Sequence, residues 1–245
     1  MEHSTSKPAP EPKDRLAVAL DFPTAKPALE LVDRLSGSCL WFKVGMELYY
    51  AAGNAFVETL RNRGFNVFLD LKLHDIPNTV AGAVRSATQA GASLLTIHAA
   101  GGPAMMAAAA EAAAAPGSPK LLAVTVLTSM DAHELTAIGV PSSPAEQVLQ
   151  LAHLAKQAGI DGLVCSAEEV GTLRTELGAE TLLVIPGIRP NGSDIGDQKR
   201  IATPRAAIER GASMLVVGRP ITRAADPAQA AKSILEEIAL AAKVL

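Results

Sequence analysis

The sequence predicts a single α/β domain folded as a (β/α)8 TIM barrel, and three observations support this prediction. Eight short apolar runs recur along the 245-residue chain, and each is followed by a stretch of helical character. The runs are almost continuously apolar, which is typical of parallel strands covered on both faces. Eight such units fit the size of a barrel. A doubly wound sheet would instead carry a glycine-rich dinucleotide motif after its first strand, where this chain has Asp21-Phe22-Pro23.

The predicted strands and helices occupy residues 15–245 as one barrel domain, whereas residues 1–14 are predicted to form a flexible tail. That tail carries proline and charge but no apolar core. The strands are expected at 16–21, 40–44, 65–69, 93–98, 121–127, 162–165, 181–185 and 214–217. The helices are expected at 22–35, 45–63, 76–90, 103–115, 144–158, 166–177, 204–210 and 226–242.

Several residues mark the ends of these helices. Thr24 and Ser166 are expected to act as N-caps, because a short hydroxyl side chain can accept a hydrogen bond from the first turn. Gly91 and Gly159 follow helical stretches as C-cap signals. Gly53 is expected to interrupt the second helix.

The composition excludes several classes of function. Hydrophobic residues make up 49% of the chain and charged residues 19%, as in a soluble protein with a core. The net charge is −3 and only one Trp, two Tyr and five Phe are present, which argues against a nucleic-acid partner. No apolar stretch approaches the roughly 20 residues that span a bilayer, and the first residues lack the apolar core of a secretory signal. We therefore expect a cytoplasmic protein that binds neither nucleic acid nor a membrane, with Cys39 and Cys165 as buried, reduced thiols.

Charged side chains stand at the ends of the first three predicted strands, where barrel enzymes build their active sites. Asp70 and Lys72 are two residues apart on a strand and should point to the same side. Burying such charges is costly unless they pair, so we expect an alternating acid–base set that converges on one mouth of the barrel. The strand-end candidates are Asp21, Lys43, Asp70, Lys72, Asp75, His98, Thr128, Ser166, the turn Pro186-Gly187-Ile188-Arg189, and Gly218-Arg219.

The run Val217-Gly218-Arg219-Pro220 indicates a phosphate site. In barrels, phosphate groups often bind to backbone N–H groups in the loops after strands seven and eight. Gly218 would let the backbone come close, and Arg219 would bind the phosphate bidentately. The polar loop 189–198 is expected to fold over a ligand as a lid.

Histidines and metals contribute less to the prediction. His98 is either catalytic or a satisfied side chain that lines the barrel, with the second reading favoured, and His74 is equally open. No His/Cys cluster has the spacing of metal ligands. Asp70 and Asp75 could in principle hold Mg²⁺, but Lys72 between them already supplies positive charge.

The motifs at these positions resemble those of the orotidine 5′-phosphate decarboxylase family over almost the whole chain from Leu16 onward. The most specific motif is Asp70-Leu71-Lys72-Leu73-His74-Asp75-Ile76-Pro77-Asn78-Thr79. The others are Val18-Ala19-Leu20-Asp21, Phe42-Lys43-Val44-Gly45, Pro186-Gly187-Ile188-Arg189 and Val217-Gly218-Arg219. The resemblance implies decarboxylation of orotidine 5′-monophosphate to UMP, the last step of de novo pyrimidine synthesis.

The resemblance also implies roles for the catalytic residues, which are Lys72, Asp70, Asp75 and Lys43. Lys72 is expected to protonate C6 of the pyrimidine once CO₂ has left, with Asp70 beside the substrate carboxylate. Asp70 would either disfavour the bound carboxylate or orient Lys72, and the sequence leaves both open. Asp21 and Lys43 are expected to contact the ribose hydroxyls and to brace the charged network.

The remaining implied roles concern the partner subunit, the ring and the phosphate. Asp75 and Thr79 are expected to serve the neighbouring subunit's site, which implies a homodimer with shared active sites. Thr128 is expected to contact the pyrimidine ring. The expected phosphate grip is Arg189, Gln198, Gly218 and Arg219. The family uses neither a metal nor an organic cofactor.

Two other readings stay open. The first is a related barrel enzyme that uses Mg²⁺ to form an enediolate from a sugar phosphate, such as hexulose-phosphate synthase or keto-gulonate-phosphate decarboxylase. Residues 74–79 favour the nucleotide decarboxylase over these enzymes. The second is a nucleotide-binding barrel that has lost its chemistry, against which the intact Asp70, Lys72 and Asp75 argue.

Overall fold

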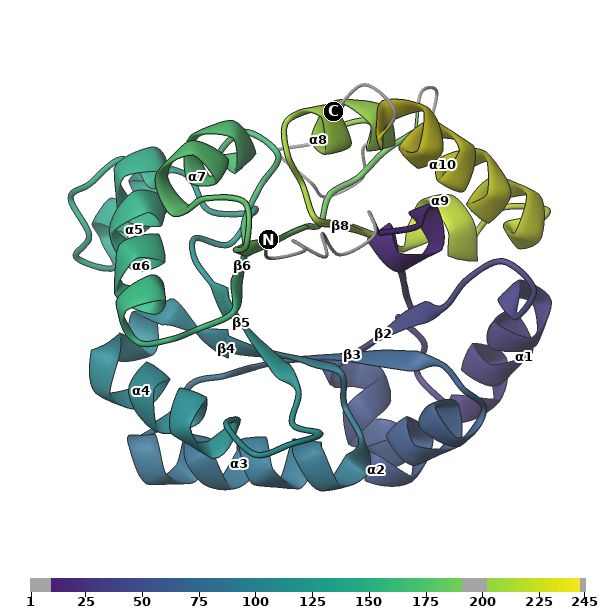
Figure 1. Ribbon diagram of the computed structural model, residues 1–245, viewed down its shortest axis with the longest axis horizontal. Helices are drawn as coiled ribbons and strands as arrows, with labels where there is room; N and C mark the ends of the chain where they lie inside the picture. Colours follow the sequence, from purple (N-terminus) through teal and green to yellow (C-terminus); the bar gives the residue numbers. More distant parts are fainter. Residues whose placement is uncertain (1–9, 191–201, 243–245) are drawn as a thin grey trace, which may run out of the picture.

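The structure is a computed structural model that describes residues 10–190 and 202–242. Eight parallel strands close into a barrel in chain order, with β8 beside β1 (Figure 1). They are β1 (Leu16–Ala19), β2 (Trp41–Gly45), β3 (Asn66–Leu73), β4 (Leu94–His98), β5 (Lys120–Val124), β6 (Gly162–Val164), β7 (Leu182–Ile185) and β8 (Met214–Val217). The predicted (β/α)8 TIM barrel is therefore confirmed.

Helices surround the ring of strands (Figure 1). They are α1 (Ala25–Leu35), α2 (Met46–Asn62), α3 (Pro77–Ala90), α4 (Gly102–Ala112), α5 (Ala132–Ala137), α6 (Pro144–Gln157), α7 (Val170–Leu177), α8 (Pro204–Glu209), α9 (Arg219–Thr222) and α10 (Pro227–Ala242), with the 3-10 helices η1 (Pro12–Arg15) and η2 (Ala99–Gly101). None of the described helices has both the length and the apolar character needed to cross a membrane.

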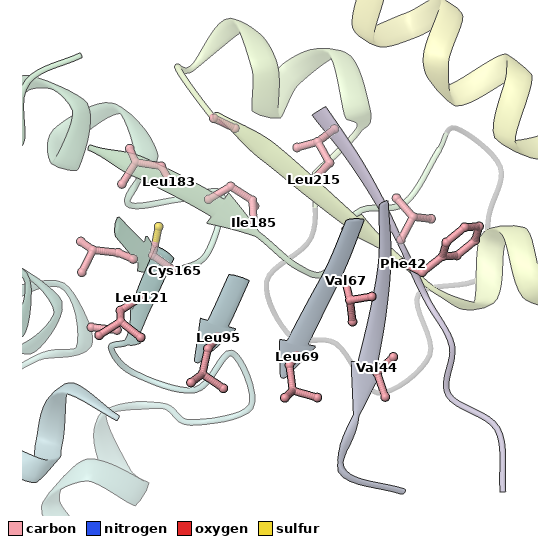
Figure 2. Packing of buried hydrophobic residues seen from close by; sticks show 14 of the residues in the cluster. Phe42, Val44, Val67, Leu69, Leu95, Leu121, Cys165, Leu183, Ile185 and Leu215 are labelled. Atoms are coloured by element: carbon pink, nitrogen blue, oxygen red, sulfur yellow. The ribbon is translucent and has the colours of Figure 1, made fainter. Parts of the chain in front are cut away.

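The barrel has two apolar layers because successive residues of each strand point to opposite sides of the sheet. Phe42 and Leu69 belong to the larger layer, which lies between the strands and the helices (Figure 2). The smaller layer contains strand residues alone and therefore fills the interior: Ala17, Ala19, Phe68, Leu94, Leu122, Val184, Met214 and Val216. The same alternation turns Lys43 and Asp70 inward, above this inner layer.

The helix ends follow the local sequence in most places. Gly91 ends α3 in the left-handed conformation with φ 85°, which glycine adopts without a steric penalty, as predicted. Gly53, with φ 64°, interrupts α2, which confirms the predicted break. Thr24 occupies the N-cap position of α1, but its side chain makes no capping hydrogen bond.

The prediction for Ser166 is wrong. Helix α7 begins at Val170, and its N-cap is Glu169. Ser166 lies one turn earlier, where its backbone N–H donates to the Glu169 carboxylate at 2.8 Å and its hydroxyl donates to the same oxygen. The Ser-x-x-Glu spacing therefore closes a turn between β6 and α7 and does not start the helix.

Strand β3 is longer than predicted, and two short helices were not predicted. β3 continues from Leu69 to Leu73 through the charged residues, which were expected to lie where the strand ends. Helix α5 is stabilised by a capping box between Asp131 and Glu134. The Asp-x-x-Glu pattern of this box is visible in the sequence of residues 121–143, where no helix was predicted. Helix α9 begins at Arg219, directly after β8.

Helix η1 spans the expected boundary between tail and barrel. It contacts β1, β8 and α10. The buried Arg15 guanidinium donates to the carbonyl oxygens of Ala212 at 2.5 Å and Ser213 at 3.4 Å. Burial, with a smaller contribution from the charge of Arg174, lowers the pKa of Arg15. Residues from Pro12 onward are thus attached to the amino-terminal end of the barrel.

Both cysteines are buried and neither is in a disulfide, as predicted. Burial disfavours the thiolate and raises the pKa of the Cys39 thiol to about 11. Cys39 packs in the outer apolar layer, where it behaves as a small hydrophobic residue.

Candidate active site

Four charged side chains form a continuous network at the carboxyl ends of β1, β2 and β3. Lys43 Nζ lies 3.1 Å from Asp21 Oδ1 and 3.5 Å from Asp70 Oδ2, so this ammonium group bridges two carboxylates. Lys72 Nζ donates to Asp70 Oδ1 at 2.8 Å. The structure therefore brings together Asp21, Lys43, Asp70 and Lys72, with acids and bases in alternation.

Asp70 is the most enclosed carboxylate of this network, with 14% of its side chain exposed against 62% for Asp21. Burial alone would raise the pKa of Asp70. The Lys43 and Lys72 ammonium groups outweigh burial, so the pKa lies below its ordinary value. Asp70 is thus a fixed negative charge at neutral pH that holds two ammonium groups in place.

The backbone of Lys72 has an unusual conformation. Its φ is 51°, and within residues 10–190 and 202–242 it is the one non-glycine residue with a positive φ. The pairing of β3 with β4 passes from Leu69 opposite Leu95 to Leu73 opposite Ile97, so the strand bulges between these pairs. Such a conformation costs roughly 1–3 kcal/mol and persists where the surroundings enforce it. The bulge thus directs Lys72 Nζ to Asp70.

Thr96 was not predicted as a site residue, and Gly45 was named only within the motif Phe42-Lys43-Val44-Gly45, without a role of its own. Thr96 on β4 is fully buried; its Oγ1 donates to Asp70 Oδ1 at 3.0 Å and accepts from the backbone N–H of Lys72 at 2.9 Å. Its signal was its place two residues before His98, on the inward side of the same strand. Gly45 leaves room for the bridge, because a Cβ there would lie 3.0 Å from Lys43 Nζ.

A cavity of about 230 Å³ lies beside the network and above the inner apolar layer. Lys43, Asp70 and Lys72 line its charged side, and Thr128 lies on its wall. The apolar lining is Phe68, Val124, Val126, Leu127, Val164, Cys165, Pro186 and Val216. A largely apolar cavity with charged groups along one side is typical of a site for a small organic ligand with a charged substituent. Larger hollows of about 400 and 1210 Å³ lie elsewhere and do not include this network.

Three of the predicted phosphate residues, Gly218, Arg219 and Arg189, lie around the end of β8 and the start of the loop after β7. Gly218 is next to the network, since a Cβ there would lie 3.5 Å from Asp21 Oδ2. Arg219 begins α9. Arg189 is buried; its Nη1 donates to the Ile188 carbonyl at 2.9 Å. The predicted lid lies largely outside the described residues.

The ends of that loop are joined. Ile188 pairs with Ala202, and the backbone N–H of Arg189 donates to the Ala202 carbonyl at 2.9 Å. The segment between these ends thus begins and finishes at one place beside β7. Gln198, predicted to close over the phosphate, lies outside the described residues.

The rings of the two histidines near the site lie close together and are tilted by 39° to each other. The His74 and His98 rings are 5.4 Å apart between centroids. Burial lowers the pKa of His98, and the positive charges of His74 and Lys72 add to this effect. His98 is therefore neutral near pH 7, at the end of β4, and neither ring lies in the lining of the 230 Å³ cavity.

Asp75 and Thr79 lie apart from the network of their own chain. Residues 74–79 are all exposed, and Ile76 is 67% exposed. Asp75 Oδ1 accepts a hydrogen bond from the backbone N–H of Ile76 at 2.6 Å. Asp70 and Lys72 of the predicted ten-residue motif thus belong to the network, whereas residues 74–79 of the same motif are exposed.

The donor set at Asp70 suits ammonium groups. Asp70 Oδ1 faces Lys72 and Thr96, and Oδ2 faces Lys43. A divalent cation at this carboxylate would meet two ammonium groups at close range, which repel it. In the part of the chain that the structure describes, no three His, Cys, Asp or Glu side chains are grouped as metal ligands. The network can hold a fixed negative charge and present a proton on Lys72.

The sequence matches a family model described as "Orotidine 5'-phosphate decarboxylase / HUMPS family" over residues 14–234. A protein of Halorhodospira halophila named orotidine 5′-phosphate decarboxylase is 55% identical over 228 residues, which cover 93% of this chain and 97% of that protein. A protein of the same name from Mannheimia succiniciproducens is 52% identical over 228 residues, with 92% and 97% covered.

The fold is similar to that of a solved structure with the same name. The crystal structure of orotidine 5′-phosphate decarboxylase from Lactobacillus acidophilus superposes with a TM-score of 0.82 at 40% sequence identity, covering 92% of this chain and 99% of that one. The family model and these relatives cover most of the sequence, and the fold is similar over 92% of the chain. The chain is therefore an enzyme of the orotidine 5′-phosphate decarboxylase / HUMPS family.

Proposed function

We propose that this chain converts orotidine 5′-monophosphate to UMP and CO₂, with Lys72 as the proton donor. The observation that carries the proposal is the alternating set Lys43, Asp70 and Lys72 beside the apolar cavity. The family model covers two kinds of chemistry, and the names of the relatives at 52–55% identity favour the nucleotide decarboxylase. We also propose that this reaction is the last step of de novo pyrimidine synthesis and that the enzyme is cytoplasmic.

The network suits a reaction in which negative charge develops on carbon. When the bond between C6 and the carboxylate breaks, its electron pair stays on C6 and CO₂ leaves. The Lys72 ammonium stabilises this charge and then transfers its proton to C6. Lys72 is already aimed by its 2.8 Å contact with Asp70, so little reorganisation is needed during the reaction.

Asp70 would lie beside the substrate carboxylate. Two adjacent carboxylates repel each other, and the repulsion ends when CO₂ departs, so Asp70 would disfavour the bound substrate more than the transition state. The low pKa of Asp70 supports this role, because the group stays ionised when a second negative charge approaches. Orienting Lys72 is a further role of the same side chain.

The phosphate of the substrate is proposed to bind Gly218, Arg219, Arg189 and Gln198. Gly218 lies within reach of Asp21, so a phosphate at this end would place the ribose hydroxyls near Asp21 and Lys43. Thr128, across the cavity, would contact the pyrimidine. Phosphate binding would fix the substrate far from the reacting carbon and support the rate as well as the affinity.

The active unit is proposed to be a homodimer in which Asp75 and Thr79 complete the partner's site. The support is that both residues are exposed and lie outside the charged network of their own chain, together with the exposed apolar side chain of Ile76. A dimer interface of stable size would cover such an apolar side chain. Asp75 would then add a carboxylate to the charged network of the partner subunit and hold the proton-donating lysine of that network in place.

An ultraviolet assay of orotidine 5′-monophosphate consumption tests the activity. We expect turnover by the wild type, full activity after EDTA treatment, and loss of at least about a thousandfold in Lys72→Ala. Lys232→Ala, which removes an exposed lysine on α10, is the matched control and should stay active. An inactive wild type, or a Lys72→Ala protein of similar rate, would show the proposal to be wrong. Loss of activity with EDTA would support the Mg²⁺ enzymes.

Mixing two inactive variants tests the shared site. In a heterodimer of Lys72→Ala with Asp75→Asn, one site carries both changes and the other carries neither. Random pairing makes half of the dimers mixed, so about one quarter of the wild-type activity should return. No recovery after the subunits have exchanged would mean that each chain builds its own site.

A further inference from the structure

We infer that Thr96 is a positioning residue that holds Lys72 and Asp70 in their reactive arrangement through its hydroxyl. This inference rests on the proposed function, because it assigns Thr96 to the orientation of the proposed proton donor. It starts from the positive φ of Lys72, which needs a partner in the surrounding barrel to maintain it.

The bulge removes the ordinary backbone partner of Lys72. Between the pairs Leu69–Leu95 and Leu73–Ile97, three residues of β3 stand opposite Thr96 alone. A partly buried backbone N–H that loses its ladder bond requires another acceptor. The Thr96 hydroxyl supplies that acceptor, 2.9 Å from the Lys72 nitrogen. The side chain of Thr96 thus takes the place of a strand carbonyl as the acceptor for the Lys72 N–H, at the residue whose φ is positive.

The same hydroxyl also holds the carboxylate of Asp70 in position. Thr96 Oγ1 donates to Asp70 Oδ1 at 3.0 Å, the oxygen that accepts from Lys72 Nζ. A closed ring results: the backbone of Lys72, the Thr96 hydroxyl, the Asp70 carboxylate and the ammonium of Lys72. Because the hydroxyl has a single proton, donation to Asp70 fixes it as an acceptor toward Lys72. Both ends of the lysine are therefore tied to one point on β4.

The position suits a supporting group and not a substrate contact. Thr96 is fully buried, and it is absent from the lining of the 230 Å³ cavity, which Asp70 and Lys72 share. Its effect on the substrate must therefore pass through these two side chains. Loss of the hydroxyl should alter the chemical step more than the binding of the nucleotide.

Two substitutions separate the hydroxyl from the volume of the side chain. Thr96→Val keeps the shape but leaves the Lys72 N–H and one Asp70 oxygen without this partner, so we expect kcat to fall on the order of 10- to 100-fold with KM changed less than about threefold. Thr96→Ser keeps the hydroxyl and should recover most of the rate. Thr125→Val is the matched control, since that buried hydroxyl donates to the Val164 carbonyl and not to the network.

The pH profile gives a readout that a loss of packing would not change. The Thr96 hydroxyl helps to keep Asp70 ionised, so in Thr96→Val the acid limb of kcat should move to higher pH. The charged and titratable groups that surround Asp70 are Lys43 and, through it, Asp21, Lys72 on β3 itself, His98 at the end of β4, and His74, which follows β3 and contacts the His98 ring. The Thr96→Ser profile should follow that of the wild type.

The outcomes distinguish this inference from the proposed function. If the wild type does not consume orotidine 5′-monophosphate, the proposed function fails. If the wild type is active and Thr96→Val keeps its kcat and its acid limb, Thr96 has no positioning role. Equal losses in Thr96→Val and Thr96→Ser would assign the effect to packing and overturn the inference. UMP binding by each variant, measured by calorimetry, identifies any protein that failed to fold; in that case Thr96→Cys replaces Thr96→Val.

Discussion

Replacing Lys43 with methionine should destabilise the barrel in a way that depends on pH. Lys43 is 9% exposed and lies between two carboxylates, at 3.1 Å from Asp21 and 3.5 Å from Asp70. Asp21 is mostly exposed, so that pair contributes little. At an effective dielectric constant of about 20, a pair at 3.5 Å attracts by about 5 kcal/mol. Relief of the desolvation of Lys43 offsets part of this, so we expect a net loss of about 2 kcal/mol at pH 7.

The sign of the pH dependence follows from Asp70. Its pKa is lowered in the folded protein, so its stabilisation is present above the pKa of the unfolded chain and is lost as the pH falls through the folded value. Without Lys43, burial opposes the charge of Asp70 with less compensation, and the pKa of Asp70 rises. The difference between wild type and Lys43→Met should therefore be largest near pH 7 and shrink toward pH 4.

Urea unfolding at pH 7, 5.5 and 4 measures this difference through the transition midpoint. Lys232→Met, at an exposed lysine of α10, is the matched control and should change the free energy of unfolding by less than about 0.5 kcal/mol. A loss in Lys43→Met that is as large at pH 4 as at pH 7 would refute the electrostatic reasoning. A loss equal to that of the control would refute the burial argument.

Three further changes test other parts of the structure. Arg15→Met should lower the free energy of unfolding by about 2 kcal/mol, because two carbonyls at the start of β8 lose a charged donor; the exposed Arg205→Met is its control, and equal urea midpoints for the two would contradict the role of η1. Gly162→Ala should cost about 3 kcal/mol by thermal melting, since a Cβ there would lie 2.3 Å from the Leu182 carbonyl oxygen, and an unchanged melting temperature would argue against this close packing of β6 and β7. The wild type should lose stability between pH 7.5 and 5.5, because burial lowers the pKa of His98 and the folded state resists protonation of this ring as the pH falls below the pKa of free histidine. His98→Gln should lose less stability over this range. Equal losses of melting temperature in the two proteins would contradict this reasoning.

Much of the fold was predictable because it depends on repeated local patterns. Apolar runs and helix-end glycines such as Gly91 act over a few residues, so the sequence displays them directly. The short helix α9 was not predictable in this way, since four residues carry too little periodicity. Ser166 was misread because a serine before a helical stretch can cap the helix or, as here with Glu169, close a turn.

The site was predictable in its members but not in its geometry. Asp70 and Lys72 were identified because burying charges at the end of a strand is costly unless the charges pair with each other or with a ligand. The left-handed conformation of Lys72 depends on a bulge, and a bulge depends on the register between two strands. Thr96 was missed for the same reason: its role appears only when β4 is placed beside β3.

The inner apolar layer has a consequence for how the charged network meets solvent. Phe68 and Leu94, almost inaccessible, lie one inward position before Asp70 and Thr96 on the same strands. Water therefore reaches the charges from the cavity and not from below. A ligand that fills the cavity displaces this water, so the network and the ligand then both lie in surroundings of lower dielectric constant. The network then acts more strongly on the bound molecule than it does in the open barrel, although none of its residues has moved.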